Sequence, residues 1–534
     1  MKRRIVMSML AGATLLAGTL LGTTPAGAAD VPARAAGVPA EFGTDWHDPV
    51  TAAPPVAKPA GKSCEVTLAR AQFRDFTPYR GTYTPPGGCG DRWSKVVLRL
   101  DGKVKGRQYD RLGYLHVGGV EIFRTSTPQP SPDGVEWSVE EDVTRYSDTF
   151  RTSRGVEMLI GNVVDDTYTG VLDVEVTLTF FQGRPDPKSP DRVLTLDGGS
   201  ALTTPRNSER ILAEVYATGS GGGCEEYWYL TVPEPAPYSC KAGQGPYREV
   251  QISVDGRLAG IAAPFPTVWT GGWSNPFLWY VIPGPRAFDI KPITYDLTPF
   301  AGILNDGRPH RVEVSVVGVP EGQSGWSTPV NVLVWQDEQR ERVTGKLTAH
   351  TAEDLTDSSV YTPGSEHRVD TEGAHRLTVA GYVDTSRGRV RTTVSRSLTG
   401  TSAHRWTDGE TRDALEAVWT DDESVTVGAR TTRTHRSYTM DGTTILGTGD
   451  RLRTVLKLGD HATVVGTSRG RRTSWSRLDD SYTGDATYTA DVPRDQRHAV
   501  GTTSERYRLS GPRGCYDRTL ATVQGMLTEN RNRC

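Results

Sequence analysis

The chain has 534 residues, of which 36% are hydrophobic and 23% charged, enough for about three domains with separate cores. Its 61 Lys and Arg against 64 Asp and Glu give a net charge of −3, which argues against nucleic acid as the natural partner. After the N-terminal residues, the chain contains no apolar run of the roughly 20 residues that a membrane-spanning helix needs. We therefore expect no membrane span.

The first residues have the pattern of a secretory signal. Basic residues at 2–4 precede an uncharged run over 5–21, and small residues at 26–28 suit a cleavage site. We exclude residues 1–28 from the fold and expect a secreted, extracellular protein that is cleaved near Ala28. Without the three basic residues of the signal, 58 of the 61 basic residues remain against 64 acidic ones.

Six cysteines lie beyond this signal. An even number in an exported chain favours disulfides over metal ligands or a catalytic thiol. The sequence leaves the connectivity open, but three local pairs are each close enough to close one loop: Cys64 with Cys89, Cys224 with Cys240, and Cys515 with Cys534. The chain has no Cys-x-x-Cys or HExxH motif and its ten histidines show no ligand spacing, so we expect no metal and no cofactor.

The first half of the chain predicts β-structure. Residues 29–62 are rich in Ala, Pro and Val and suggest a leader or linker. Over 63–187, the runs 96–100 and 174–180 alternate apolar and polar residues, as half-buried strands do, and helical periodicity is almost absent. We predict a jelly-roll-like antiparallel β-sandwich over 63–187.

A second β-sandwich of the same type is predicted over residues 188–341, from alternating runs at 211–216 and 312–316. Its middle is crowded with aromatic residues. They include Trp228, Trp269, Trp273, Trp279 and Tyr280. Such rings pack in cores or stack on the faces of sugar rings, and we expect about half of them to be core.

Residues 342–534 contain many Thr, Arg, Ser and Asp residues in long alternating runs separated by turns. These runs predict a third β-rich region, with little concentrated chemistry, that serves as a support or contact module. The whole chain is therefore expected to be all-β.

The stretch 106–130 carries the first candidate for chemistry. Its apolar residues over 112–123 predict a hairpin with a Gly-Gly turn. Tyr109, Asp110 and Arg111 stand at the start of the first strand, where a rigid element can hold side chains at a cleft. An Asp beside an Arg at a strand edge is also a common surface ion pair, so the residues alone leave both interpretations open.

The second candidate lies in GSGGGCEEYWYL, residues 219–230, where Glu225 and Glu226 directly follow Cys224. A disulfide-held turn there would fix an acid at the junction of the two sandwiches. Carboxylates held on rigid strands can serve as general acids or bases. A solvated loop acid is the alternative interpretation.

Two runs together resemble a known family: YDRLGYLHVGGVEIFRTSTPQP at 109–130 and GTYTPPGGCGDRW at 81–93. They resemble the plant-type (acid) peptide-N-glycanases, the peptide-N4-(N-acetyl-β-glucosaminyl)asparagine amidases of type A. The resemblance covers roughly residues 64–329, and the tail looks like the less distinctive remainder of the same family. It implies hydrolysis of the amide between an N-glycan and asparagine, with N-glycosylated peptides or proteins as substrates.

The resemblance also implies roles for individual residues. In relatives with this activity, including the distantly similar bacterial peptide-N-glycanase F type, the site lies in the groove between two jelly-roll domains. Asp110, preceded by aromatic Tyr109 and followed by Arg111, looks like the principal base. Glu226 looks like the second acidic group, and Glu225 is its rival because a slip of one residue exchanges them.

One further substrate contact follows from the resemblance. Asn162 stands where the bacterial type has another acid, with Asp165 or Asp166 as alternatives for that role. Tyr109 and Arg111 beside Asp110 are also expected to bind substrate. Trp228 and Trp273 are expected to contact sugar because aromatic planes suit the C–H faces of sugar rings, and Gly271 and Gly272 would give Trp273 a flexible mount. An arginine that the bacterial type keeps after a Trp-containing stretch has no counterpart close to Trp273, so none is assigned.

Other classes of function fit the same residues. One is a carbohydrate-binding sandwich protein without catalysis, and another is a glycoside hydrolase of the endo-N-acetylglucosaminidase type, which leaves one N-acetylglucosamine on the peptide. A purely structural surface protein fits the C-terminal region alone. We expect a monomer, and the sequence leaves the glycan preference open, including tolerance of core α1,3-fucose.

Overall fold

The computed structural model describes residues 38–186, 188–220, 223–269, 275–323 and 325–534, and the fold is all-β, as predicted. The predicted signal, residues 1–28, lies outside the described residues. Helical structure in the described chain is limited to α1 (Ala301–Leu304) and short 3₁₀ segments. These are η1 (Thr144–Tyr146), η2 (Thr149–Arg151), η3 (Cys224–Leu230), η4 (Pro276–Leu278), η5 (Thr298–Phe300), η6 (Asp408–Glu410) and η7 (Arg494–Gln496). Within these ranges, no helix is long and apolar enough to cross a membrane.

The first unit is built from two four-stranded antiparallel sheets, ordered β1-β8-β3-β6 and β2-β7-β4-β5. Every second residue over most of β8 is buried, including Val174, Val176 and Leu178, so the alternation in the sequence marks the face that packs in the core. The strands are β1 (Ser63–Phe73), β2 (Tyr79–Tyr83), β3 (Trp93–Val104), β4 (Leu112–Val117), β5 (Val120–Ser126), β6 (Val135–Asp142), β7 (Arg154–Ile160) and β8 (Leu172–Gln182).

The second unit also has two four-stranded antiparallel sheets, ordered β10-β16-β13-β14 and β15-β11-β18-β9, and a short β12-β17 pair beside them. Its strands are β9 (Arg192–Thr195), β10 (Ala201–Leu202), β11 (Ser208–Val215), β12 (Thr218–Gly219), β13 (Glu249–Val254), β14 (Arg257–Ala262), β15 (Ile293–Asp296), β16 (His310–Val317), β17 (Trp326–Ser327) and β18 (Val330–Gln336). Both units therefore have the two-sheet arrangement expected of sandwiches.

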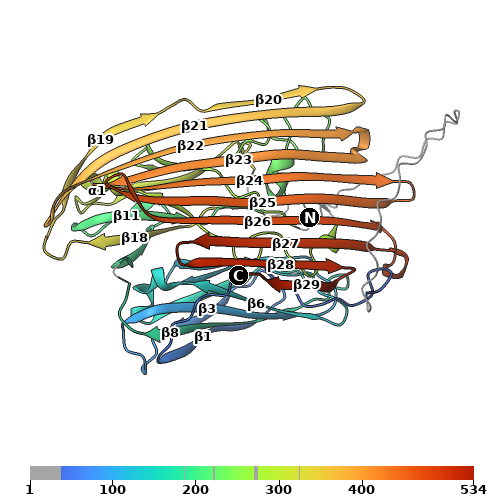
Figure 1. The fold of residues 1–534 in the computed structure, drawn as a ribbon, viewed down its shortest axis with the longest axis horizontal. Helices are drawn as coiled ribbons and strands as arrows, with labels where there is room; N and C mark the ends of the chain where they lie inside the picture. Colours follow the sequence, from blue (N-terminus) through green and yellow to red (C-terminus); the bar gives the residue numbers. More distant parts are fainter. Residues whose placement is uncertain (1–37, 187, 221–222, 270–274, 324) are drawn as a thin grey trace.

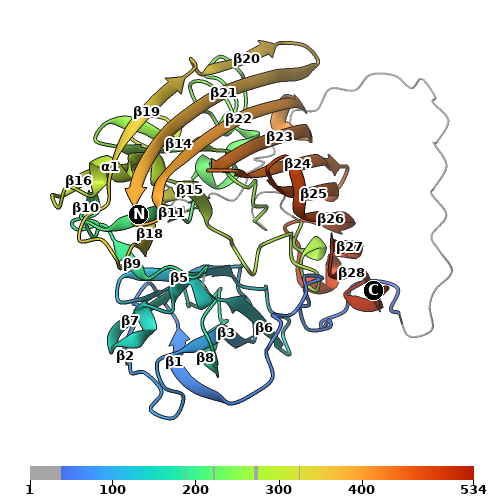
Figure 2. The ribbon, with the colours of Figure 1, turned by 60° about the vertical axis from the view of Figure 1, so that its left-hand side comes forward.

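The C-terminal region forms a single 11-stranded antiparallel sheet, much larger than either sheet pair. Its strands lie side by side in Figure 1, and Figure 2 shows the sheet curving over the second unit. They are β19 (Thr344–Ala352), β20 (Thr356–Thr362), β21 (Glu366–Thr385), β22 (Gly388–Thr407), β23 (Arg412–Val427), β24 (Arg430–Gly447), β25 (Arg451–Ser468), β26 (Arg471–Thr489), β27 (Val500–Gly511), β28 (Gly514–Val523) and β29 (Met526–Asn532).

One face of this sheet packs on the second unit. Buried and more exposed residues alternate along the 20 residues of β21, which is the pattern of a sheet with one covered face. On the covered face, the Tyr482 hydroxyl donates to the carbonyl of Leu278 over 2.7 Å, and Asn275 Nδ2 donates to the carbonyl of Ala486 over 2.8 Å. Many of the Thr, Arg and Asp residues that dominate the sequence here face solvent, but others, such as Arg396, Asp421 and Asp480, are buried under the sheet.

The segment that composition marked as a leader or linker is bound to all three units over residues 38–60, which we call the N-terminal strap. Its Phe42 N–H donates to the carbonyl of Ala499 over 2.7 Å, and its Val50 N–H donates to Val281 over 2.8 Å. Asp48 accepts the N–H of Glu136 in β6 over 2.8 Å. Because these partners lie in different units, the strap ties the C-terminal sheet to both sandwiches (Figure 2).

All three predicted cysteine pairs are joined in the structure: Cys64–Cys89, Cys224–Cys240 and Cys515–Cys534. The second bridge holds the first residue of η3 and so anchors the turn that carries both candidate glutamates.

Candidate active site

Asp110 lies in the loop between β3 and β4, two residues before β4 begins, and it is half-buried. The backbone on either side is fixed. The N–H of Arg111 donates to Thr127 Oγ1 over 2.9 Å, and the N–H of Tyr109 donates to Gln108 Oε1 over 3.0 Å. The acid therefore stands at the mouth of a strand, as the sequence predicted, on a loop with little freedom.

Gln108 is the residue that holds this loop, and sequence reasoning missed it. The side chain is buried, and its Nε2 donates to the carbonyls of Val163 and Gly170 over 2.9 and 3.2 Å. Its Oε1 accepts the Nε–H of Arg111 over 3.1 Å and also contacts Arg111 Nη2. A lone Gln in a loop has no spacing or motif that signals such a role, apart from its position beside Tyr109.

The structure separates the two rival glutamates in η3. Glu225 is 1% exposed, and its carboxylate accepts Arg248 Nε and Nη2 over 2.9 and 2.6 Å and Trp326 Nε1 over 2.6 Å. These three donors occupy both of its oxygens in the interior. Glu226 is only half-buried. Glu225 thus has a structural ion pair, whereas Glu226 is the one within reach of solvent.

Asp110 and Glu226 act on the same side chains although they come from different units. Burial lowers the pKa of Arg111, and the charges of Asp110 and, more weakly, Glu226 oppose that effect. Burial raises the pKa of Tyr227 far above its ordinary value, and both carboxylates add to the rise, Glu226 also through a hydrogen bond. The charges of both acids therefore affect the pKa of Arg111 and the pKa of Tyr227.

An exposed aromatic pair borders Asp110. Tyr109 is 46% exposed, and its ring centroid lies 5.3 Å from that of Tyr168 at a tilt of 48°. The guanidinium of Arg107 lies 5.6 Å from the centre of the Tyr168 ring, within the range of a cation–π contact. Tyr168 was not predicted, because it is 59 positions away from Tyr109 in the chain and lies in a polar turn.

Asn162, predicted as a sugar contact, has a different place. It is fully buried, and its Nδ2 donates to the carbonyls of Phe73 and Gly170 over 2.9 and 3.1 Å. Its Oδ1 accepts the N–H of Val163 over 2.9 Å. Asn162 and Gln108 therefore bind the same backbone carbonyl, that of Gly170, and Asn162 supports the loop that carries Asp110. We withdraw Asn162 from the set of substrate contacts.

Of the two predicted tryptophans, the structure describes Trp228. Trp228 is 2% exposed and packs edge-on against Tyr229 and Trp419, with centroids 5.7 and 5.4 Å away. It is a core residue, because the C-terminal sheet covers it, so we also withdraw it as a sugar contact. Trp273 lies outside the described residues.

A buried arginine joins the two units behind the site. Arg124 in β5 pairs with Glu121 over 2.7 and 3.0 Å and donates to Thr218 Oγ1 in β12 over 2.7 Å. It also donates to Ser327 Oγ in β17 over 3.0 Å. Since β4 and β5 form the hairpin that follows Asp110, and β12 leads into η3, this network fixes the relative position of the two acidic segments.

Among the described residues, no three His, Cys, Asp or Glu side chains are grouped so that they could hold a metal ion. The arrangement is instead that of carboxylates, an arginine and tyrosines, which can transfer protons and stabilise a developing negative charge. The fold and this junction define a class: an all-β protein in which an acid from each of two neighbouring β-sandwiches influences the same arginine and tyrosine.

The family is identified by comparison. A sequence profile described as "Peptide N-acetyl-beta-D-glucosaminyl asparaginase amidase A" matches residues 49–353, more than half of the chain, and the chain belongs to this family. The match confirms the resemblance found in the sequence, and it includes both acidic segments.

The chain is also similar to individual proteins. The peptide-N4-(N-acetyl-beta-glucosaminyl)asparagine amidase A of Prunus dulcis is 29% identical over 381 residues, which cover 63% of this chain and 66% of that protein, slightly less than two thirds. Two structures of PNGF-II, in space groups C2 and P21, are 14% identical with a TM-score of 0.36. They cover 51% of this chain and 65% and 66% of theirs.

Proposed function

We propose that this protein is a secreted amidase that cleaves the β-aspartylglucosamine bond of N-glycosylated peptides or proteins. Family membership supports the reaction class. The observation that carries the choice of residues is the common influence of Asp110 and Glu226 on Arg111 and Tyr227. Export is supported by the signal pattern over 1–28 and by three disulfides, which form and persist in oxidising compartments.

In the proposed reaction, Asp110 accepts a proton from a water molecule, and the water oxygen attacks the side-chain carbonyl carbon of the glycosylated asparagine. Arg111, which stays charged, stabilises Asp110 or the negative oxygen of the tetrahedral intermediate. The carbon–nitrogen bond then breaks as the nitrogen takes up a proton. The products are an aspartate in the peptide and a free glycosylamine.

Glu226 has the second role. Its half-buried carboxylate would accept a hydrogen bond from the proximal sugar or assist the departing glycosylamine, while Glu225 stays in its ion pair with Arg248. The exposed ring of Tyr109, with Tyr168 beside it, offers an aromatic face for the C–H side of a sugar ring.

The test is a glycopeptide assay by mass spectrometry. The proposed reaction releases the whole glycan and converts Asn to Asp. An endo-N-acetylglucosaminidase would leave one sugar on the peptide, and a carbohydrate-binding protein would leave the glycopeptide intact. Asp110→Asn should abolish the conversion without loss of the fold. Asp101→Asn, at a surface ion pair with Arg99 in β3, is the matched control and should retain activity. Near-normal activity of Asp110→Asn would contradict the assignment.

A further inference from the structure

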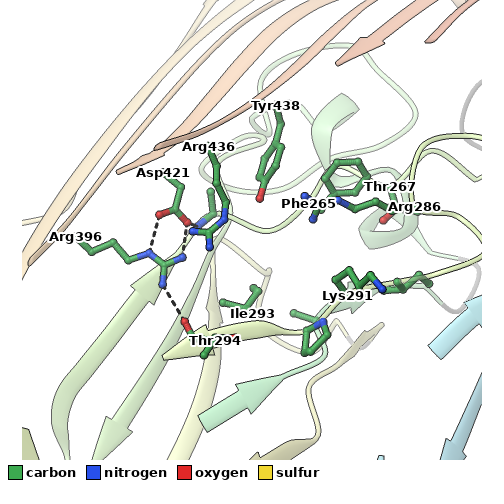
Figure 3. Close-up of a pocket in the computed structure, with 14 residues that line it drawn as sticks. Phe265, Thr267, Arg286, Lys291, Ile293, Thr294, Arg396, Asp421, Arg436 and Tyr438 are labelled. Atoms are coloured by element: carbon green, nitrogen blue, oxygen red, sulfur yellow. Dashed lines mark hydrogen bonds and ion pairs between the residues drawn. The ribbon is translucent and has the colours of Figure 1, made fainter. Parts of the chain in front are cut away.

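A polar cavity of about 80 Å³ lies between the second unit and the covered face of the C-terminal sheet. Loop residues from 263–267 and 286–292 and the first two residues of β15 form one side, and residues of β22, β23 and β24 form the other (Figure 3). Four cationic side chains line it: Arg286, Lys291, Arg396 and Arg436. A volume of this size holds several water molecules or one small polyatomic ion.

Three of these cations already have carboxylate partners. Arg396 forms a two-pronged pair with Asp421, over 2.7 and 2.6 Å, and Arg286 forms one with Asp460, over 2.6 and 2.9 Å. The ammonium of Lys291 lies 2.5 Å from Asp289 and also pairs with Glu141. Their charges are therefore balanced within the protein.

Arg436 differs from the other three. Its Nη1 is buried and has no hydrogen-bond acceptor among the described residues. Asp421 stands directly opposite Arg436 across the β23–β24 ladder and would be the natural cross-strand partner. The Asp421 carboxylate, however, is occupied by the two prongs of Arg396 and by the N–H of Ala263 at 3.4 Å.

The surroundings favour an acceptor with negative charge. A buried guanidinium N–H without an acceptor is costly, and the cost falls most when the acceptor is anionic. The hydroxyl of Tyr438 and the guanidinium of Arg436 both point into the cavity in Figure 3, from the same strand β24. The guanidinium of Arg286 lies over the Tyr438 ring, 5.4 Å from its centre, and the Tyr438 hydroxyl can donate its proton to an acceptor in the cavity.

We propose that this cavity binds a small inorganic oxyanion of the phosphate or sulfate type, held by the guanidinium of Arg436 and the Tyr438 hydroxyl. The bound ion links β24 to the loops of the second unit and so strengthens the contact between the C-terminal sheet and the sandwich beneath it. The proposal is independent of the amidase function, since none of these residues belongs to the proposed catalytic group.

The test measures the unfolding temperature of the full-length protein in sodium phosphate or sodium sulfate, with sodium chloride keeping the ionic strength constant. Binding to the folded state raises the unfolding temperature with the logarithm of the oxyanion concentration. In Arg436→Gln, the apparent affinity should fall roughly tenfold or more, and in Arg436→Lys, which keeps the charge, it should fall less. Arg433→Gln alters an exposed arginine on the same strand and should behave as the wild type.

Two results would overturn the proposal. One is a wild-type unfolding temperature that is equal in chloride and in the oxyanions at the same ionic strength, as expected of a cavity that holds only water. The other is an oxyanion effect of equal size in the wild type and in both Arg436 variants, which would place the ion elsewhere. Isothermal titration of the wild-type protein with inorganic phosphate gives the stoichiometry, and one ion per chain is expected.

Discussion

Replacement of Glu505 by Gln should flatten the dependence of stability on pH, because Glu505 is one of two buried acids that face each other. Glu505 in β27 and Asp480 in β26 are 4% and 3% exposed and are hydrogen-bonded to each other. Burial raises the pKa of both, and the charges of Glu505 and Asp460 raise that of Asp480 further. Glu505 also accepts the N–H of Ala52 in the strap over 3.4 Å, so the pair lies at a contact between units.

The magnitude follows from the raised pKa. Burial moves the pKa of Glu505 from 4.5 to about 7, so the folded protein keeps this proton at pH values where the unfolded chain has released it. The stabilisation is fully present below pH 4.5 and is lost as the pH rises through about 7. At about 1.4 kcal/mol for each pH unit, the loss is on the order of 3 kcal/mol.

The Gln side chain removes this titration but keeps the contacts. Its carbonyl oxygen can accept from Ala52, and its amide can donate to Asp480. The free energy of unfolding is measured by urea denaturation at a series of pH values. From acidic to alkaline pH, the difference between the variant and the wild type should shift by up to about 3 kcal/mol toward a more stable variant.

Other groups titrate in the same range. Burial raises the pKa of Asp289 and of Asp357 to about 6 each, so only the difference between variant and wild type is informative. Glu416→Gln, at an exposed position on β23, is the control and should give a difference that does not depend on pH. If the difference in unfolding free energy between Glu505→Gln and wild type were likewise constant from acidic to alkaline pH, the explanation by a raised pKa of Glu505 would be refuted.

Three other predictions test the site and its supports. Glu226→Gln should lose deglycosylation with an unchanged unfolding midpoint. Glu225→Gln should instead lower the free energy of unfolding by roughly 3–5 kcal/mol, because it leaves the buried Arg248 without its counter-charge. Equal effects of the two variants on the midpoint would contradict these different roles. Gln108→Ala should lower kcat for glycopeptide by roughly tenfold or more through misplacement of Arg111, while an unchanged kcat would show that the loop is held otherwise. Trp46→Ala removes a ring stacked 3.9 Å from Tyr280 and should cost about 3–5 kcal/mol in denaturation experiments, and a loss below about 1 kcal/mol would mean that the strap contributes little.

The sequence by itself determined the local features. Period-two alternation defined the strands and therefore the all-β class, because it specifies which face of a strand is buried without reference to its partner. Spacing suggested the three cysteine pairs that the structure joins, although it left their connectivity open, since each pair is only 16 to 25 positions apart. The same local reasoning placed Asp110 at the mouth of β4, where a turn meets an apolar run.

Only the tertiary structure decided which side chains are available. Glu225 and Glu226 are neighbours in the same turn, but Glu225 is buried because Arg248 and Trp326, 23 and 101 positions away in the chain, donate to its carboxylate. Trp228 is a core residue because the C-terminal sheet covers it. Burial and pairing of this kind depend on partners far away in the chain, and the spacing of residues along one strand or turn contains no information about them.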